Sequence, residues 1–498
     1  MVERSIELDL PDETASSILG EDLAAMLRPG DVLALHGDLG MGKTTLARAI
    51  IRGLHGEPDL EVPSPTFTLL QAYEARFPIH HFDLYRLAAA DEFEELGFDE
   101  AVRDGVALIE WPERAEERLP GDAVAVVLSE LGAGRRAHIT GPADFMARLD
   151  RSLAIRGFLD RSGYRGATRA YLVGDASARA YETISLEQAA PVILMNAPRP
   201  PSGPPVRDGK PYAQIAHISE SVVPFVAIAR ALRDKGFCAP EVYASDFERG
   251  LLLIENLGSE GILDADGEPI GERYLASAEL LAGIHRHEWQ PQIEATPGIV
   301  HTIPPFDRDA LSIESELLVD WYLPHIAGRP ATDAERAAFS RAWAAVFDTL
   351  DRCEKSIVLR DVHSPNIIWR KDRSGSDRIG IIDFQDAMIG PSAYDVASLA
   401  MDARVTIPAE LENAIVEAYV AARQAQGGFD RRAFEAAYAI TAAQRNTKIL
   451  GIFVRLDVRD GKPGYLKHLP RIRSYVARAI THPALRPVRD LYAELGIL

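Results

Sequence analysis

The fold class that the sequence predicts is an α/β domain followed by a larger α+β domain with two lobes. Three observations predict it. At 498 residues the chain is too long for one ordinary domain. Residues 31–54 read as an apolar strand, a glycine-rich loop and an alanine-rich helix. Residues 358–387 read as two short apolar strands, with an Asp and an Asn ahead of the first and an Asp directly after the second.

The composition is typical of a folded protein outside the membrane. Charged residues make up 26% of the chain and hydrophobic residues 47%, and no apolar run approaches the roughly 20 residues that span a bilayer. The first residues are acidic and lack the pattern of a signal or transit peptide. The two cysteines, Cys238 and Cys353, are too few for a metal or disulfide framework. We therefore expect a cytoplasmic protein.

The negative charge is concentrated at the N-terminal end. Residues 1–150 hold 29 acidic and 13 basic residues, a net charge of −16 out of −20 for the chain. This part is therefore poorly suited to strong nucleic-acid binding on its own, and its acidity suits docking to a basic protein surface. Residues 445–489 are locally basic, which we interpret as a solvated helical face because aromatic residues are sparse there.

The glycine-rich loop follows the strand DVLALH and reads GDLGMGKTT. This spacing is typical of the phosphate-binding loop of P-loop NTPases. The glycines let backbone N–H groups turn toward the β-phosphate, the lysine reaches the β- and γ-phosphate oxygens, and the next hydroxyl binds Mg²⁺. The residues predicted to bind the nucleotide are Gly37, Asp38, Gly40, Gly42, Lys43, Thr44 and Thr45, with Thr44 also a Mg²⁺ ligand.

Two apolar strands that follow each end in a carboxylate. Asp83 lies near the end of the strand IHHFDL, and Glu110 lies near the end of VALIEW. A P-loop NTPase needs such a carboxylate near its Mg²⁺, and open α/β sheets place their chemistry at strand ends. We predict both as catalytic acids, although each alone could be a solvated strand end. Thr66 follows two prolines in VPSPTFTL and precedes the next strand, and it could bring a hydroxyl to the γ-phosphate. An ordinary turn residue is an equally good interpretation.

These motifs resemble the small bacterial ATPase family required for threonylcarbamoyladenosine synthesis on tRNA. The resemblance covers residues 4–141 and is carried by GDLGMGKTTLAR, VPSPTFTLL, HHFDLYRL and ALIEWPERAEERLP. It implies a doubly wound P-loop domain that binds ATP and Mg²⁺ and works with the partner proteins of the tRNA modification. It also implies that Thr66, Asp83 and Glu110 surround Mg²⁺ and the γ-phosphate, with Thr66 and Glu110 as metal ligands, and that Trp111 lines the site.

The boundary between the domains is expected at residue 145, which gives domains of residues 1–145 and 146–498. Apolar residues at Phe145, Leu149, Leu153 and Phe158 predict a helix that opens the second domain. No Gly/Ser-rich tether lies there, so the linker is short.

The segment at 358–387 carries the residues that phosphoryl transfer from ATP requires. It reads VLRDVHSPNIIW, a turn-rich KDRSGSDR and IGIIDFQDA. We predict that Asp361 orients the attacking hydroxyl and accepts its proton, and that Asn366 and Asp383 bind Mg²⁺. Asp395, shortly after, is expected to cap a helix and to brace this loop through hydrogen bonds.

A small β-rich lobe is predicted ahead of this segment. The turn GDASARAY would close over the ATP phosphates with its backbone amides and the Ser177 hydroxyl. The strand PVILMN lacks the phosphate-pairing lysine expected there and has Met195 near its centre. The strand GLLLIENLG ends at a hinge, with the adenine pocket expected beside Glu255.

This order of lobe, hinge and helical part resembles the protein-kinase-like fold of the aminoglycoside phosphotransferase superfamily. Over residues 169–470 it is most similar to the anomeric N-acetylmuramate/N-acetylglucosamine kinases of cell-wall recycling, on the motifs GDASARAY, LLLIENLG, LRDVHSPNIIW, IIDFQDAMIGPSAYDVASLAMDAR and QRNTKILGIFVRL. The resemblance implies transfer of the ATP γ-phosphate to the anomeric hydroxyl of an amino sugar. The strand without lysine also resembles this branch.

Our leading hypothesis is a fusion with two ATP sites. One alternative is another acceptor for the second domain, such as an aminoglycoside or choline. These are cations and need an acidic or aromatic pocket, whereas a pocket of amides and bases favours N-acetylmuramate. The other alternative is a regulator that binds nucleotide without turnover, which the intact Asp361, Asn366 and Asp383 argue against.

Overall fold

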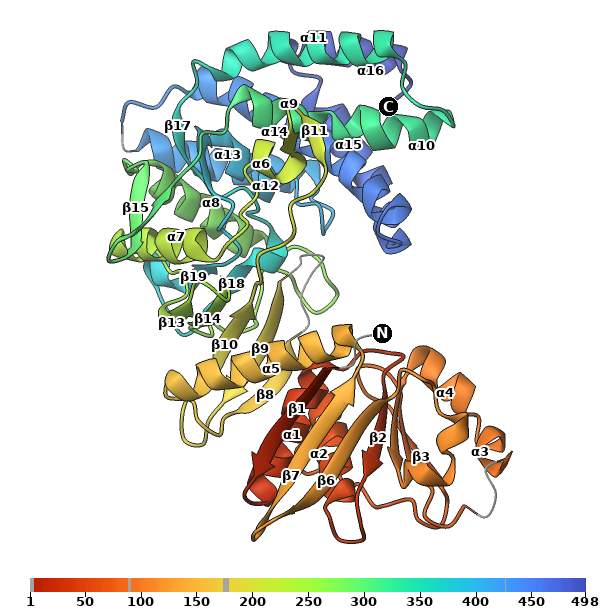
Figure 1. The fold of residues 1–498 in the computed structure, drawn as a ribbon. Coiled ribbons are helices and arrows are strands. Elements are labelled where there is room, and N and C mark those ends of the chain that lie inside the picture. The colour runs from red at the N-terminus through yellow and green to blue at the C-terminus, as the bar shows by residue number, and fades with distance from the viewer. Residues whose placement is uncertain (1–3, 88–90, 173–178, 426) are drawn as a thin grey trace. The chain divides into compact units, whose positions relative to one another are not determined.

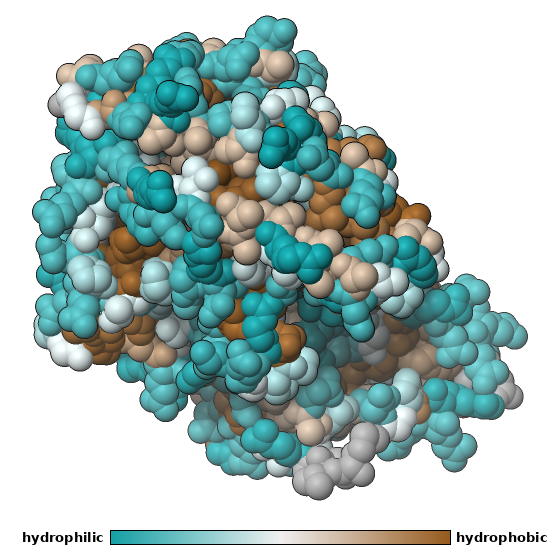
Figure 2. All heavy atoms as spheres, turned by 90° about the horizontal axis from the view of Figure 1, so that it is seen from above, coloured by the Kyte–Doolittle hydropathy of each residue, from teal (hydrophilic) through white to brown (hydrophobic). Residues whose placement is uncertain are grey.

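The computed structural model describes residues 4–87, 91–172, 179–425 and 427–498. They form two compact units, one of residues 1–197 with 244–254 and the other of residues 198–243 with 255–498. Figure 1 shows the course of the chain through both. Within the described residues no helix has the length and apolar character to cross a membrane. On the face drawn in Figure 2 hydrophilic side chains predominate, with hydrophobic ones in small patches between them.

The first unit begins with a seven-stranded sheet in the order β1-β7-β6-β2-β5-β4-β3. Strands β6, β2, β5 and β4 are parallel to one another, and the flanking pairs are antiparallel. The elements are β1 Arg4–Leu10, α1 Glu13–Met26, β2 Val32–His36, α2 Lys43–His55, β3 Leu70–Tyr73, β4 Ile79–Asp83, α3 Asp91–Glu95, α4 Phe98–Asp104, β5 Val106–Glu110, the 3₁₀ turns Pro112–Arg114 and Glu116–Arg118, β6 Val124–Leu131 and β7 Gly134–Gly141.

Helices cover both faces of this sheet, which explains why its central strands are apolar throughout. In β5, Val106 and Leu108 pack into the core beneath α1 and α2. The alternate residues Ala107 and Ile109 pack with Phe82 and the helices on the other face. The predicted doubly wound α/β domain is confirmed.

One helix, α5 (Ala143–Arg161), contributes side chains to two hydrophobic cores. Its first turns place Phe145 and Leu149 in the core of the seven-stranded sheet, against α1. Its last turns place Ile155 and Phe158 against a second sheet. Figure 1 shows α5 running from the first sheet to the second. The predicted helix is confirmed, and the predicted boundary at residue 145 stays a prediction.

The second sheet has five strands in the order β13-β14-β10-β9-β8. Its elements are β8 Thr168–Leu172, β9 Ala180–Ser185, β10 Val192–Asn196, β13 Val242–Asp246 and β14 Leu251–Ile254. Side chains at every second position, among them Ile184, Leu194 and Leu253, face α5. This is the predicted β-rich lobe, and it belongs to the same compact unit as the P-loop domain.

The second unit is mainly helical and is built around α14, which is buried over most of its length. Two short antiparallel ladders, β17–β20 and β18–β19, carry the predicted phosphoryl-transfer segment. The elements are β11 Pro205–Arg207, β12 Lys210–Pro211, α6 Tyr212–Ile215, α7 Val223–Asp234, α8 Gly271–His285, β15 Gln292–Thr296, β16 Ile299–Thr302, α9 Arg308–Ser315, the π-helical turn Leu318–Tyr322, α10 Leu323–Ala327, α11 Asp333–Leu350, β17 Lys355–Val358, the 3₁₀ turn Ser364–Asn366, β18 Ile367–Trp369, the 3₁₀ turn Gly375–Arg378, β19 Ile379–Ile381, β20 Met388–Pro391, α12 Ala393–Ala400, α13 Ala409–Gln424, α14 Arg431–Val458, the 3₁₀ turn Pro463–His468, α15 Leu469–Ala479, the 3₁₀ turn Pro483–Leu485 and α16 Arg486–Glu494.

Two candidate active sites

The loop between β2 and α2 depends on its glycines. Gly37, Gly40 and Gly42 have φ angles of 139°, 83° and 97°, values that side chains with a Cβ rarely adopt. A Cβ on Gly37 would also lie 2.7 Å from the carbonyl oxygen of Leu128. The loop therefore brings its backbone close to the start of α2, where the helix dipole and the unpaired N–H groups favour an anion.

Lys43, the first residue of α2, is held over this loop. Its Nζ donates to the carbonyl oxygens of Gly37 at 2.5 Å and Asp38 at 3.0 Å, and lies 3.6 Å from the ring centroid of Trp111. Burial lowers the pKa of Lys43, although Glu110 and other acids nearby oppose the shift. The lysine can exchange the carbonyl oxygens for phosphate oxygens without leaving the loop.

A carboxylate joins this loop to the neighbouring strands. Thr44 Oγ1 donates to Glu110 Oε2 at 2.8 Å, and Glu110 Oε1 lies 2.9 Å from His81 Nε2. His81 is fully buried, so it fixes the orientation of Glu110. The sequence analysis missed this histidine. The signal was available, because His81 and Asp83 are two positions apart on β4 and so share a face.

Asp83 gathers the hydroxyl groups of the next loop. Its Oδ2 accepts from Ser64 Oγ at 2.6 Å and from Thr66 Oγ1 at 2.8 Å. Asp83 and Glu110 are opposite each other in the register of β4 and β5. The structure thus brings together the predicted Thr44, Thr66, Asp83 and Glu110, while Thr45 lies in the first turn of α2. Ser64 was not predicted.

The oxygen donors of this site fit Mg²⁺ shared with phosphates. Mg²⁺ is usually bound by one or two protein oxygens, substrate phosphates and water. Among the described residues no group of three or more His, Cys, Asp and Glu side chains forms a protein-only metal cage. A hydroxyl such as Thr44 Oγ1 beside a carboxylate such as Glu110 is the donor set that a nucleotide-bound Mg²⁺ requires.

The second site, in the second unit, is organised by Asp395. This fully buried residue of α12 accepts the backbone N–H of Leu359 at 2.7 Å and that of Arg360 at 2.9 Å. The predicted brace of the loop is confirmed. The predicted helix cap is wrong, because α12 starts at Ala393, before Asp395. Asp361 is the next residue of the braced loop, so its position is well defined.

The hairpin β18–β19 brings Asn366 and Asp383 together. Asn366 Nδ2 donates to the carbonyl oxygen of Asp361 at 2.9 Å and lies 3.4 Å from Asp383 Oδ2. Asp383 has a φ of 61°, a left-handed conformation that Asp tolerates better than most residues, and Gln385 Nε2 donates to its Oδ1 at 2.8 Å. A side-chain amide next to a carboxylate again fits a phosphate-bound Mg²⁺, for which the amide oxygen and the carboxylate would be the ligands.

Cations from α14 approach Asp361. Arg445 Nη2 lies 3.9 Å from Asp361 Oδ1. Arg445 is 2% exposed, and its Nε and Nη1 have no hydrogen-bond partner among the described residues. Arg445 and the buried Lys448 begin the basic segment that we interpreted as a solvated face, and for them that interpretation is wrong. The long helix α14 passes through the core, so its basic residues meet the site.

Not all of these cations are available to a ligand. Glu314 is fully buried and pairs with Arg360 and with Lys448, the latter at 3.2 Å. Burial opposes ionisation of Glu314, but these two cations hold its pKa below the usual range. Glu314 therefore offsets much of the charge of Arg360 and Lys448, while Arg445 keeps unpaired donors.

Asp361 is an ionised carboxylate in this environment. Burial favours its neutral form, but the surrounding cations, led by Lys448, outweigh that effect and lower the pKa of Asp361 to about 2. Such a carboxylate is a weak base. It can orient a hydroxyl group and accept a proton from it as that proton is released.

Two further predicted residues, Ser177 and Glu255, remain to be accounted for. Ser177 lies outside the described residues. The carboxylate of Glu255 lies 3.3 Å from Arg233 Nη1 and 3.5 Å from Arg370 Nη2, and accepts the backbone N–H of Glu241 at 3.2 Å. These contacts occupy the carboxylate, so a role beside adenine would fall to the Glu255 backbone.

Comparisons with known proteins divide the chain in the same way. The family model "Threonylcarbamoyl adenosine biosynthesis protein TsaE" matches residues 10–137, and the model "Phosphotransferase enzyme family" matches residues 168–435. The N-acetylmuramate/N-acetylglucosamine kinase of Caulobacter vibrioides is 33% identical over 351 residues, which cover 68% of this chain and 95% of that protein. The tRNA threonylcarbamoyladenosine biosynthesis protein TsaE of Rickettsia felis is 42% identical over 130 residues, 26% of this chain and 75% of that protein. Both resemblances found in the sequence are confirmed.

Proposed function

Because the chain belongs to the TsaE family over residues 10–137 and to the phosphotransferase enzyme family over residues 168–435, we propose that it is a bifunctional ATP-dependent enzyme. The first domain is the ATPase of tRNA threonylcarbamoyladenosine synthesis. The second phosphorylates the anomeric hydroxyl of N-acetylmuramate and N-acetylglucosamine. The observation that carries the kinase proposal is the braced Asp361 beside the Asn366–Asp383 pair.

In the kinase, Asp361 binds the acceptor hydroxyl and directs its oxygen toward the γ-phosphorus of ATP. The new P–O bond forms as the bond to the β,γ-bridging oxygen breaks, ADP leaves, and the hydroxyl proton passes to Asp361. Asn366 and Asp383 would hold Mg²⁺, which neutralises charge on the phosphates when bound. An anomeric hydroxyl is more acidic than an ordinary alcohol, so a weak, well-placed base suffices.

In the ATPase, Lys43 and the loop amides would hold the β- and γ-phosphates. Thr44, Thr66 and Glu110 would bind Mg²⁺, and Asp83 keeps Thr66 in place through its hydrogen bond. ATP hydrolysis would release ADP and phosphate. The acidic surface of this domain favours the partner proteins of the tRNA modification, rather than tRNA itself, as its docking partners. Both functions belong in the cytoplasm.

The surroundings of Asp361 favour an acidic acceptor over a cationic one. Arg445 is buried, its ion pair with Asp361 is long at 3.9 Å, and its Nε and Nη1 have no hydrogen-bond partner among the described residues. Buried N–H donors left unpaired are costly, so a ligand that accepts from them is favoured. N-acetylmuramate carries a carboxylate, whereas aminoglycosides and choline are cations that Arg445 would repel. This supports N-acetylmuramate as the preferred acceptor.

The test is a phosphorylation assay with the full chain, Mg-ATP and four acceptors: N-acetylmuramate, N-acetylglucosamine, kanamycin and choline. We expect sugar 1-phosphate from the first two only. Phosphorylation of kanamycin or choline would show that the acceptor is a cation and not the proposed amino sugar. No product from any of them, with ATP still bound, would identify the second domain as a nucleotide-binding regulator.

We expect Arg445→Gln to raise KM for N-acetylmuramate by about 10- to 100-fold, since a charge-assisted hydrogen bond contributes about 1.5–3 kcal/mol. KM for N-acetylglucosamine, which has no carboxylate, should change by less than about threefold. Steady-state kinetics with both sugars measure the difference. Arg432→Gln, at an exposed position of the same helix, is the matched control, and Arg445→Lys should restore part of the affinity. An equal rise in KM for both sugars would indicate that Arg445 contacts the phosphate groups of ATP and not the carboxylate of the sugar.

The kinase should not lose activity through protonation of Asp361 at mildly acidic pH. The pKa of Asp361 is lowered from 3.8 to about 2, so the carboxylate is ionised above about pH 4. Its ionisation also stabilises the fold above the unfolded-state pKa of 3.8, and that contribution is lost as the pH falls toward about 2. A kcat/KM profile for the sugar checks this. An acid limb centred near about pH 6, with the melting temperature unchanged, would contradict it.

A further inference from the structure

A cavity separate from both candidate active sites lies within the first compact unit. Its volume is about 640 Å³, and its lining includes residues of the P-loop domain, of α5 and of β8. Cavities of this size hold small molecules. The cationic and aromatic side chains that line it are Arg28, Arg76, Arg148, Arg151, Arg169 and Tyr171.

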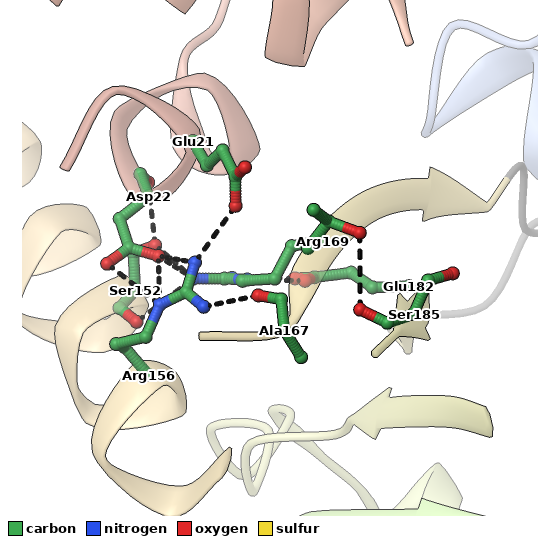
Figure 3. A network of polar contacts seen from close by, with 9 residues as sticks. Glu21, Asp22, Ser152, Arg156, Ala167, Arg169, Glu182 and Ser185 are labelled. Carbon is green, nitrogen blue, oxygen red and sulfur yellow. Dashed lines mark hydrogen bonds and ion pairs between the residues drawn. The ribbon is translucent and has the colours of Figure 1, made fainter. Parts of the chain in front are cut away.

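Two of these arginines are neutralised by carboxylates. Arg148 binds both oxygens of Asp31, at 2.8 and 2.7 Å. Arg169 binds both oxygens of Glu182, at 2.7 and 2.8 Å, and also Asp22 at 2.8 Å. Figure 3 shows Arg169 and its partners as a network that joins α1, α5 and the five-stranded sheet. This network forms one wall of the cavity, and its two arginines, Arg156 and Arg169, meet three carboxylates, those of Glu21, Asp22 and Glu182.

Arg151 is different, because it has only a neutral acceptor. Its Nε and Nη2 donate to Asn196 Oδ1 at 3.1 and 2.6 Å. No carboxylate among the described residues forms an ion pair with it. Burial lowers the pKa of Arg151, and the more distant Asp246 only partly opposes the shift. The guanidinium is thus held in place, half-buried, with its charge only partly compensated by Asp246.

Arg76, which also lines the cavity, is exposed, and Glu182 is the nearby acid that acts on its charge. Its Nη2 donates to the carbonyl oxygen of Leu27 at 2.9 Å, and no described carboxylate forms an ion pair with it. Its guanidinium carbon lies 4.5 Å from the ring centroid of Tyr171 and 4.9 Å from that of Phe77. The side chain is partly exposed, but these contacts fix its head group at the cavity.

We propose that this cavity is a binding site for a small molecule that carries a diphosphate or polyphosphate group, with Arg76 and Arg151 as its ligands. Two guanidinium groups that form no ion pair with a described carboxylate match a ligand with at least two negative charges, and guanidinium binds phosphate oxygens in a bidentate manner. Arg76 comes from the P-loop domain and Arg151 from α5, so the ligand stabilises the docking of the P-loop domain against the small lobe. This site is independent of the function proposed above.

Isothermal titration with pyrophosphate tests the site. All proteins carry Lys43→Ala and Asp383→Asn, so that neither candidate active site dominates the signal. We expect Arg151→Gln and Arg76→Gln each to weaken pyrophosphate binding at least tenfold. Arg151→Lys, which keeps the charge but not the bidentate donor geometry, should lose less affinity than Arg151→Gln. Arg161→Gln, at an exposed position of the same helix, should have no effect.

Two further measurements keep the result interpretable. Thermal unfolding of each variant without ligand shows that the fold is intact, and pyrophosphate should raise the melting temperature of the parent but not of Arg151→Gln. Inorganic phosphate, with one phosphate group, should bind more weakly than pyrophosphate. The proposal is overturned if Arg151→Gln and Arg76→Gln bind pyrophosphate as the parent does, or if Arg161→Gln loses as much affinity as they do.

Discussion

Replacing Asp361 by Asn is expected to slow sugar phosphorylation by about 10²- to 10⁴-fold. The amide has nearly the same shape, so the loop braced by Asp395 keeps its conformation. It cannot accept the proton of the attacking hydroxyl, and it removes the negative charge that lies 3.9 Å from Arg445. The rate of sugar 1-phosphate formation under saturating ATP measures the effect.

The reciprocal variant is Lys43→Ala. It removes the side chain that contacts the loop carbonyls in the P-loop domain, and it should abolish ATP hydrolysis there while sugar phosphorylation continues. Asp361→Asn should leave that hydrolysis unchanged. If each substitution lowered both activities equally, the two sites would not be independent.

Replacing Asp22 by Asn is expected to lower the free energy of unfolding of the first unit by about 3 kcal/mol. Asp22 is 1% exposed, and its Oδ1 lies 2.9 Å from Arg156 Nη2 and 2.8 Å from Arg169 Nη1. The amide would remove the buried carboxylate that the two guanidinium groups share, leaving Arg169 with Glu182 and Arg156 with the less buried Glu21. Urea denaturation followed through the unfolding of the first unit measures the loss.

Asp9→Asn is the matched control for this stability change. Asp9 also pairs with an arginine, Arg136, at 3.0 Å, but at the surface, where its side chain is 64% exposed. Exposed pairs contribute about 0.2–1 kcal/mol, so the loss should be at most that. A loss for Asp22→Asn no larger than for Asp9→Asn would mean that water or rearrangement compensates the buried arginines.

Local patterns in the sequence predicted the parts of both sites that lie next to strands. Lys43, Thr44, Asp83 and Glu110 each follow or end an apolar strand, and parallel strands bring their ends to one edge of a sheet. Asp361 was predictable for a similar reason, because its loop follows a short strand. In such cases the position of a residue at or just after a predicted strand is enough to indicate that it lies at the site.

Contacts between distant segments could not be predicted in this way. Arg445 lies in a helix far along the chain from Asp361, and a basic residue in a helix usually indicates a solvated face. Only the burial of α14 shows otherwise. The ion pair of Asp22 with Arg169 joins residues 147 positions apart, and neither residue lies in a motif. Packing of whole elements, rather than local pattern, brings these groups together.

The sharing of α5 between two cores determines how the two activities can be separated experimentally. A cut at the expected boundary, after residue 145, falls inside this helix. A fragment that starts at residue 146 would expose Leu149, and the complementary fragment would lose the same side chain from its core. Truncated halves would therefore report on damaged folds. Point substitutions in the intact chain are the sound way to assign each activity to its domain.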